Sequence, residues 1–298
     1  RGQEENTFYE TRTMATGIQF SNEDPFVVKR IIKDGPLDVK GKNIRIGDRL
    51  IAVNGKKVDN KMNREIYFVQ PSLDKELTLT FDRNGTTNDV RLHPISSNRM
   101  RGLLYDEWID TNQNYVDTKS GKKVAYIHMK NMGSRSLEGF KREMVSEATK
   151  RDALILDLRY NTGGNVHDEV LQFLSQKPYL QWKYREGKLT SQPNFSPASK
   201  PIIVLINEQS LSDAEMTPAG FKQLGLGTLM GTETYRWIVF TSGSRLVDGS
   251  FYRLPSWGCY TLDGKNLEKE GVKPDIFVDK NFKDRIEGNH PQLDRAKE

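Results

Sequence analysis

The sequence predicts an α/β chain (α+β overall) in two parts, with a β-rich first part and alternating strands and helices in the second. In the first part, short alternating apolar runs end in turn signals such as Asn54-Gly55 and Asn84-Gly85. From Lys123 onward, buried apolar runs alternate with helically spaced segments, which indicates βαβ units and a parallel sheet. We expect an N-terminal remnant (1–12), a first domain (13–96), a connecting segment (97–122) and a second domain (123–298).

Composition limits the classes of function. A length of 298 residues suits two domains at about 100–200 residues each. No apolar run approaches the roughly 20 residues that cross a bilayer, so we expect no membrane span. The net charge of +5 is scattered, so we expect no nucleic-acid partner. The single cysteine excludes an internal disulfide, and the four histidines lack metal-ligand spacing, so we predict no metal and no cofactor.

The chain opens Arg1-Gly2-Gln3, without Met and without a signal peptide. We therefore expect it to be a piece of a longer protein. Localisation stays open between a bacterial-type periplasm or cell envelope and the cytoplasm.

In the first part, 26–32 reads as a strand that ends at the breaker Asp34-Gly35-Pro36. In 44–55, Gly47-Asp48 predicts a tight turn that leads into a strand, and Asn54-Gly55 is a hairpin signal at the end of that strand. A further strand is expected at 77–81, and a short helix at 61–70.

Ile46-Gly47-Asp48-Arg49-Leu50-Ile51-Ala52-Val53-Asn54-Gly55, preceded by Asp34-Gly35-Pro36-Leu37, resembles the central signature of PDZ domains. The resemblance implies that an extended peptide adds as a strand to a sheet edge beside a helix. The groove would be lined by Gly17, Ile18 and Phe20 and by the helix near 62–69. These apolar residues fit a plain core equally well.

In the second part, the pattern predicts parallel strands. The loops that follow their carboxyl ends are expected to converge on one crevice. The expected strands are 124–129, 153–158, 202–207 and 228–231, and the expected helices are 134–149, 166–174 and 216–224. The connecting segment before them carries Trp108 and Tyr115, so we expect it to pack against other parts of the chain.

Ser212 follows the apolar run 202–206 and precedes the helix at 216–224. Ser212-Asp213-Ala214-Glu215 is a capping box, with Ser212 as N-cap and Glu215 reaching back to its amide. A hydroxyl held where a strand turns into a helix is also well placed as a nucleophile. Gly163-Gly164, after 153–158, could direct backbone N–H groups toward it as an oxyanion hole, although most Gly-Gly pairs are turns.

The arrangement of nearly the whole chain resembles the serine-peptidase family that includes the C-terminal-processing and tricorn proteases. The matching segments are 156–164, 212–215, 225–234, 271–276 and 290–294. The resemblance implies a PDZ domain before a catalytic domain of crotonase-like or ClpP-like spiral ββα architecture. It implies that Ser212 is the nucleophile, with Ser210 as the alternative, and that backbone amides of Asp213 and of Gly163 or Gly164 hold the oxyanion.

Trp237 stands where the processing proteases have their catalytic Lys, and Arg236 does not release its proton at working pH. Tricorn-like members of the family also lack this Lys, and the segments 101–109, 126–129 and 246–250 resemble them as well. The resemblance is therefore to the tricorn-like branch, which implies Ser–His–Glu chemistry. Glu268 matches the Glu, with Glu270 as the second choice and a solvated turn carboxylate as the plain alternative. The His would come from a segment upstream of this chain, since none of His93, His128, His167 and His290 matches it.

The expected partners are peptides or unfolded polypeptides as substrates, and a homo-oligomer is a further candidate. Two other functions stay open. The chain could be a catalytically degenerate PDZ protein that binds peptides, which the missing Lys and His favour. Acyl-CoA chemistry on a crotonase-like fold is the third, although no basic site for an adenosine phosphate is apparent.

Overall fold

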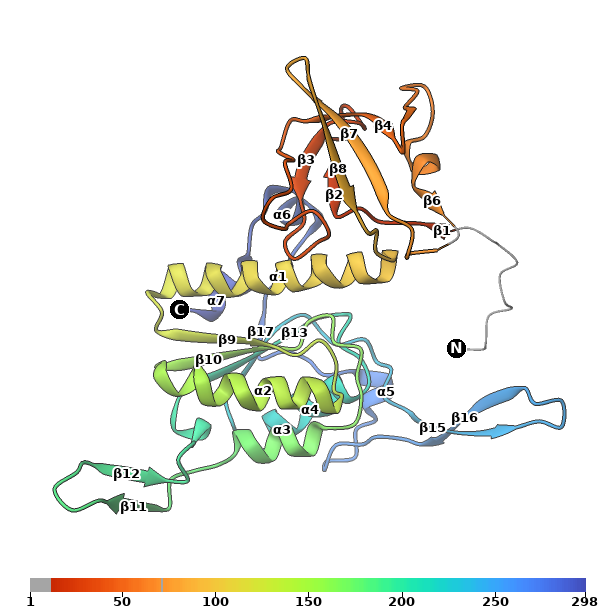
Figure 1. The fold of residues 1–298 in the computed structure, drawn as a ribbon. Helices are drawn as coiled ribbons and strands as arrows, with labels where there is room; N and C mark the ends of the chain where they lie inside the picture. The colour runs from red at the N-terminus through yellow and green to blue at the C-terminus, as the bar shows by residue number, and fades with distance from the viewer. Residues whose placement is uncertain (1–11, 71) are drawn as a thin grey trace. The chain divides into compact units, whose positions relative to one another are not determined.

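The computed structural model describes residues 12–70 and 72–298, so nearly all of the expected N-terminal remnant lies outside the described residues. The described chain divides into two compact units, 12–110 and 111–298 (Figure 1). The expected connecting segment is one continuous helix, α1 (Ser97–Ser120), which begins in the first unit and ends in the second. No helix within the described ranges is long and apolar enough to cross a membrane.

The first unit is built from short antiparallel strands, as expected. Within the described residues, these form a four-stranded sheet in the order β5-β4-β7-β8 and two strand pairs, β2-β3 and β1-β6. The strands are β1 (Arg12–Thr13), β2 (Ile18–Phe20), β3 (Val28–Ile31), β4 (Arg49–Val53), β5 (Lys56–Lys57), β6 (Val69–Gln70), β7 (Leu77–Arg83) and β8 (Thr86–Leu92).

Two hairpin turns of this unit confirm the sequence signals. Asn54 and Gly55 have φ of 50° and 75°, and Asn84 and Gly85 have φ of 53° and 84°. Positive φ at both central residues is the geometry of a type I′ turn, which matches the twist of the flanking strands. The apolar residues of these strands form one buried cluster, which includes Phe26, Leu50, Leu77, Leu79 and Phe81.

The helix expected at 61–70 is wrong in type and length. The structure has only a 3-10 turn, η1 (Arg64–Phe68), with Asn63 as its N-cap. Val69 and Gln70 form strand β6, which pairs with Thr13 and Arg12 of β1. The backbone of these two residues is therefore used in strand pairing, which ends the helical turn.

The second unit contains a five-stranded parallel sheet in the order β17-β14-β13-β10-β9. Its strands are β9 (Val124–His128), β10 (Ala153–Asp157), β13 (Ile202–Ile206), β14 (Thr228–Gly231) and β17 (Ile276–Phe277). Parallel pairing confirms the βαβ interpretation of this part. Ile127, Leu156, Val204 and Leu229 are neighbours across four strands, each at most 1% exposed, and mark the centre of the core.

Helices α2 (Ser134–Ser146), α3 (His167–Leu174) and α4 (Asp213–Gln223) cover one face of this sheet (Figure 1). The opposite face is covered by α7 (Pro291–Ala296) and the second half of α1, where Asn112 donates to Tyr126 of β9. The remaining helical elements are η2 (Ala148–Lys150), η3 (Pro197–Ser199), α5 (Leu267–Glu270) and α6 (Phe282–Glu287). The sequence did not predict α5, α6 or α7.

Two hairpins that the sequence analysis did not predict extend from the second unit. They are β11 (Leu180–Lys183) with β12 (Leu189–Gln192), and β15 (Phe240–Arg245) with β16 (Phe251–Trp257). Both hairpins protrude from the layers around the parallel sheet (Figure 1). Their side chains are largely exposed, because a two-stranded ribbon has no second layer on either face.

A buried polar cluster joins the C-terminus to the sheet. Arg159 Nη2 lies 2.5 Å from Asp157 Oδ2, and Tyr126 donates to the same oxygen at 2.7 Å. Arg159 Nη1 donates to Gln292 of α7 at 2.7 Å. Burial, reinforced by the charge of Asp157, holds the pKa of Tyr126 well above its ordinary value. Asp157 and Arg159 are therefore stable in the interior only as a pair.

Replacing Arg159 with Met leaves the buried carboxylate of Asp157 without its cation. We expect this change to lower the free energy of unfolding by about 3–5 kcal/mol. The exposed pair Lys283–Glu287, with 3.8 Å between the charged atoms, supplies the control. Lys283→Met should change the stability by less than about 0.5 kcal/mol. Urea unfolding followed by circular dichroism measures both, and similar losses in the two variants would contradict the assignment.

Candidate active site

Ser212 lies at the junction of β13 and α4, as the sequence predicts, and is the N-cap of α4. Its backbone has φ 58° and ψ −123°, in a region that a residue with a side chain rarely adopts. Such a conformation is strained and persists only where the surrounding contacts fix it. The bond from Ser212 N–H to the carbonyl of Trp237, at 2.8 Å, is one of the contacts that do so.

The carboxylate of Glu215, which is 0% exposed, makes further contacts that fix the Ser212 backbone. Its Oε1 accepts the N–H of Ser212 at 3.2 Å, which is the reach-back of the predicted capping box. The same oxygen accepts the N–H of Trp237 at 2.8 Å. Oε2 accepts the Thr234 hydroxyl at 2.6 Å and the Arg236 N–H at 2.8 Å. Glu215 therefore fixes Ser212 and the segment 234–237 together.

Gly163 and Gly164 lie where a side chain would not fit. A Cβ on Gly163 would lie 2.6 Å from Ser212 Cβ and 3.1 Å from Ser212 Oγ. A Cβ on Gly164 would lie 2.0 Å from the carbonyl oxygen of Met132. The structure thus brings the Gly163-Gly164 loop directly against Ser212, as the sequence analysis expected.

The two glycines differ in their N–H groups. Gly163 N–H donates to the Asn161 side chain at 2.9 Å. Within 12–70 and 72–298, neither Gly164 N–H nor Asp213 N–H has a protein acceptor. Two free amides beside a hydroxyl are the donors that an oxyanion hole requires. The geometry therefore favours Gly164 over Gly163 as the partner of Asp213.

The side chain of Asp213 has a role that the sequence analysis missed. Its carboxylate is 2% exposed, and Oδ2 accepts the N–H of Val166 at 2.7 Å and of His167 at 3.1 Å. Oδ1 lies 2.5 Å from His167 Nδ1. The interaction with the Asp213 carboxylate raises the pKa of His167 against the opposing effect of burial. No signal in the sequence spacing relates positions 167 and 213.

Glu268 approaches the same segment from α5. Its Oε2 accepts the N–H of Ile238 at 2.7 Å and of Val239 at 2.8 Å, next to the Trp237 carbonyl that holds Ser212. Glu268 is half-buried, so it is not a freely solvated turn carboxylate. Glu270 is exposed and lines an open groove with Lys265 and Lys273. The geometry therefore favours Glu268 over Glu270.

Ser210 is the less suitable of the two serines. It is 0% exposed, and its hydroxyl donates to the Leu158 carbonyl at 2.8 Å while it accepts the N–H of Asn207 at 3.0 Å. These bonds give Ser210 a structural role in the loop before Ser212.

None of the described histidines is hydrogen-bonded to Ser212. His128 ends β9 with its side chain buried, and burial lowers its pKa to about 4. His290 precedes α7, where its ring lies 4.6 Å from that of Tyr115. His167 is held by Asp213, and His93 follows β8 in the first unit. No group of three or more potential ligands among the described residues could hold a metal ion.

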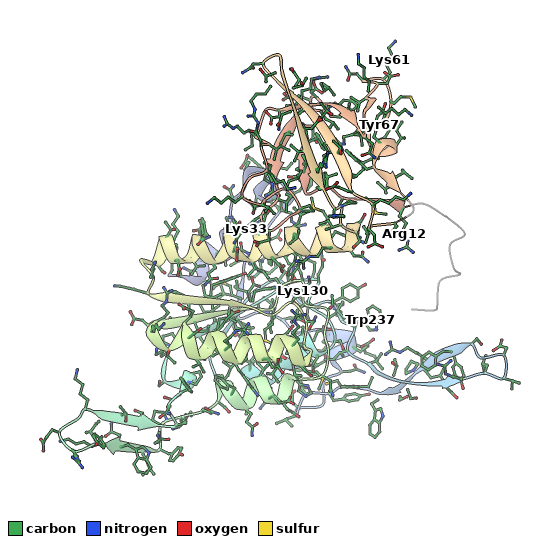
Figure 2. The ribbon with its side chains drawn as sticks, viewed as in Figure 1. Arg12, Lys33, Lys61, Tyr67, Lys130 and Trp237 are labelled. Atoms are coloured by element: carbon green, nitrogen blue, oxygen red, sulfur yellow. The ribbon has the colours of Figure 1, made fainter. Side chains whose placement is uncertain are left out.

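Trp237, which the sequence analysis places at the position of the processing-protease Lys, presents its side chain outward. It is 53% exposed, and its ring centroid lies 6.0 Å from that of Tyr235. Figure 2 marks its place near the start of the segment that leads to β15. Its backbone carbonyl accepts the N–H of Ser212.

In the first unit, a small pocket beside β2 contains some of the residues of the expected peptide groove, but not Gly17. Ile18, Phe20, Arg64 and Phe68 are among its lining residues, and the Arg64 guanidinium lies 4.3 Å from the Phe20 ring centroid. Ile18 and Phe20 are also members of the buried core. Gly17, before β2, has φ 79° and packs so closely on Pro36 that a Cβ would lie 2.8 Å from Pro36 Cδ.

Comparisons with known proteins agree with both resemblances. Residues 123–278 match peptidase family S41, and residues 15–93 match the PDZ domain family. The chain is 32% identical over 216 residues to the tricorn protease of Thermoplasma acidophilum, covering 72% of this chain and 20% of that protein. It is 30% identical over 266 residues to tricorn protease homolog 1 of Streptomyces coelicolor, covering 88% of this chain and 24% of that protein.

A crystal structure of the tricorn protease superposes on 96% of this chain and 28% of its own length, with a TM-score of 0.82 and 26% identity. The chain thus spans about a fifth to a quarter of the length of the two curated relatives named above. The structural similarity extends over both units, each of which has its counterpart in a matched family.

The contact between Gly163 and Ser212 makes a measurable prediction. Gly163→Ala should lower the free energy of unfolding by about 1–3 kcal/mol through overpacking, in addition to about 1 kcal/mol for Ala at positive φ. Gly121→Ala is the matched control, because Gly121 has φ 59° and open space around its Cα. It should show only the backbone cost. Equal losses for the two variants in urea unfolding would show that position 163 tolerates a methyl group.

Proposed function

The chain belongs to peptidase family S41, and we propose from this premise that it hydrolyses peptide bonds by acyl transfer to Ser212, as a tricorn-like serine endopeptidase. The observation that carries the proposal is the junction at Ser212. A strained serine between a core strand and a helix lies against a glycine loop, with free N–H groups at Gly164 and Asp213. That combination supplies a nucleophile and two oxyanion donors in one place.

In this mechanism a histidine removes the proton of Ser212 Oγ while the oxygen attacks the scissile carbonyl carbon. The C–O bond forms, and the electron pair of the carbonyl moves to its oxygen, which accepts the N–H groups of Asp213 and Gly164 (or Gly163). The histidine then gives the proton to the leaving amine, and the peptide bond breaks. Water hydrolyses the acyl-enzyme by the same steps.

Glu268 is proposed to orient that histidine and to stabilise its cation. The histidine itself is proposed to come from a segment outside these 298 residues, because none of those described is bonded to Ser212. Loss of a general base costs about 10²–10⁴-fold in rate. The 298 residues by themselves should therefore hydrolyse peptides feebly.

The PDZ domain is proposed to bind extended polypeptide beside β2, near Gly17, Ile18 and Phe20, and so to deliver substrate. β2 pairs only with β3 among the described strands, which leaves its other edge open to strand addition. Peptides or unfolded polypeptides are therefore the proposed substrates. Further copies of the chain are proposed partners in a homo-oligomer.

The competing proposal is a catalytically degenerate, peptide-binding protein. The observation that favours it is the combination of Trp237 in place of the Lys with a Ser212 that is bonded to no histidine. The two proposals differ in whether Ser212 reacts, and this can be measured directly.

Ser212→Ala should reduce hydrolysis of an internally quenched peptide library by at least about 10³-fold in the full-length protein, because it removes the nucleophile. It should also abolish labelling by a fluorophosphonate. Ser244→Ala, on the exposed hairpin, is the matched control and should retain both signals. A full-length protein that neither cleaves nor labels would favour the degenerate alternative instead.

Glu268→Gln should lower kcat by about 10²–10⁴-fold, because a neutral amide cannot stabilise the histidine cation. Gln keeps an oxygen that can accept the N–H groups of Ile238 and Val239, so the local fold is retained. Glu270→Gln, two residues away on the exposed side, should leave kcat unchanged. The assignment is overturned if the two variants change places in this assay.

A further inference from the structure

We propose that His167 is a positioning residue for the reaction, which acts with the Asp213 carboxylate to hold the Gly163-Gly164 loop against Ser212. The inference rests on the proposed function. It assigns His167 an indirect role, since its ring is held by Asp213 and not by Ser212.

The Asp213 carboxylate binds the residues that follow the Gly163-Gly164 loop. Before the loop, the Asn161 side chain accepts the N–H of Gly163 at 2.9 Å and donates to the Met129 carbonyl at 2.7 Å. Beyond Gly164, Val166 and His167 donate their N–H groups to Asp213 Oδ2. The loop is thus fixed at both ends, and its second anchor is the residue that follows the nucleophile.

The backbone and the side chain of Asp213 therefore both help to position the two proposed oxyanion donors. Its free N–H is one proposed oxyanion donor, and its carboxylate fixes the loop that carries the other donor, Gly164. A displacement of about 1 Å in a group that contacts the reacting atoms can cost about 10²-fold in rate. The ion pair between His167 and Asp213, called the clamp below, therefore helps to set the distance between the N–H groups of Asp213 and Gly164.

Charge explains why a histidine occupies this position. Asp213 is 2% exposed, and a carboxylate at that depth requires hydrogen bonds and a compensating charge. The charged groups that face His167 are Asp213 from α4 and Asp168 and Glu169 from its own helix, and all three are acidic. They favour the protonated imidazole, which supplies the cation beside the buried carboxylate.

The orientation of the ring distinguishes this role from general-base catalysis. Nδ1 lies 2.5 Å from Asp213 Oδ1, and Nε2 lies 3.5 Å from Asp168 Oδ1. Both ring nitrogens thus face carboxylates. A general base must instead lie within hydrogen-bond reach of the hydroxyl proton that it removes.

The test compares three variants of the full-length protein. His167→Ala removes the clamp, and His167→Asn retains a donor near the position of Nδ1. Asp168→Asn is the matched control, because that exposed side chain touches Nε2 but not Asp213. Hydrogen exchange of a peptide covering 159–168, measured by mass spectrometry, reports the loop whether or not the protein cleaves a substrate.

We expect His167→Ala to accelerate exchange in this peptide and to lower kcat by about 10–100-fold, with KM within about 2-fold of the native value. His167→Asn should restore most of both, and Asp168→Asn, which removes only an exposed charge and keeps the pair between His167 and Asp213, should stay close to the native protein. The pKa of His167 is raised in the folded protein, so its charge contributes fully below the ordinary value of about 6.5. The native protein should therefore exchange more slowly than His167→Asn in this peptide at low pH, and this difference should shrink as the pH rises through the pKa of His167 in the folded protein.

Two results would overturn the proposal. One is native exchange and native kcat in His167→Ala. The other is a complete loss of kcat in both His167→Ala and His167→Asn with unchanged exchange, which would make His167 the base. Faster exchange in His167→Ala together with a native protein that cleaves no peptide would support the clamp and reject the proposed peptidase function.

Discussion

The buried carboxylate of Glu215 is the interaction on which the arrangement around Ser212 depends. It accepts four hydrogen bonds, from Ser212, Thr234, Arg236 and Trp237, at the first turn of α4. Four donors satisfy a carboxylate that has no access to water, which would otherwise cost several kcal/mol. The same bonds hold Ser212 in a backbone conformation that it would not adopt alone.

A second carboxylate on the same helical turn complements the first. Glu215 binds the segment that follows β14, whereas Asp213 binds the start of α3 after β10. Residues two apart on a helix point in different directions, so one turn can fix two loops from different strands. Both carboxylates also lie at the N-terminus of α4, where the helix dipole stabilises negative charge. The first turn of this helix thus serves as the common anchor for the loops on either side of Ser212.

The sequence predicted the parts of this site that depend on local pattern. Buried apolar runs and turn signals are local, so the parallel strands, the two type I′ hairpins and the N-cap at Ser212 were predictable. The 3-10 turn at Arg64–Phe68 was not, because pairing with β1 overrides its helical pattern. Neither was the ion pair between Asp213 and His167, which joins distant positions by tertiary packing alone. The preference for Gly164 required knowing that Asn161 already occupies the N–H of Gly163.

The chain of bonds from Ser212 through Trp237 to Glu268 also constrains when the site can form. The Ser212 amide is bonded to the Trp237 carbonyl, and the next two amides along the chain are bonded to Glu268. These contacts join residues that are far apart in sequence, and such contacts form late because the intervening chain must be ordered first. During synthesis, Ser212 and Glu215 therefore emerge well before Trp237 and Glu268. A chain released before Glu268 contains the serine but lacks the carboxylate that binds the Ile238 and Val239 amides, so this part of the site forms only in the finished second unit.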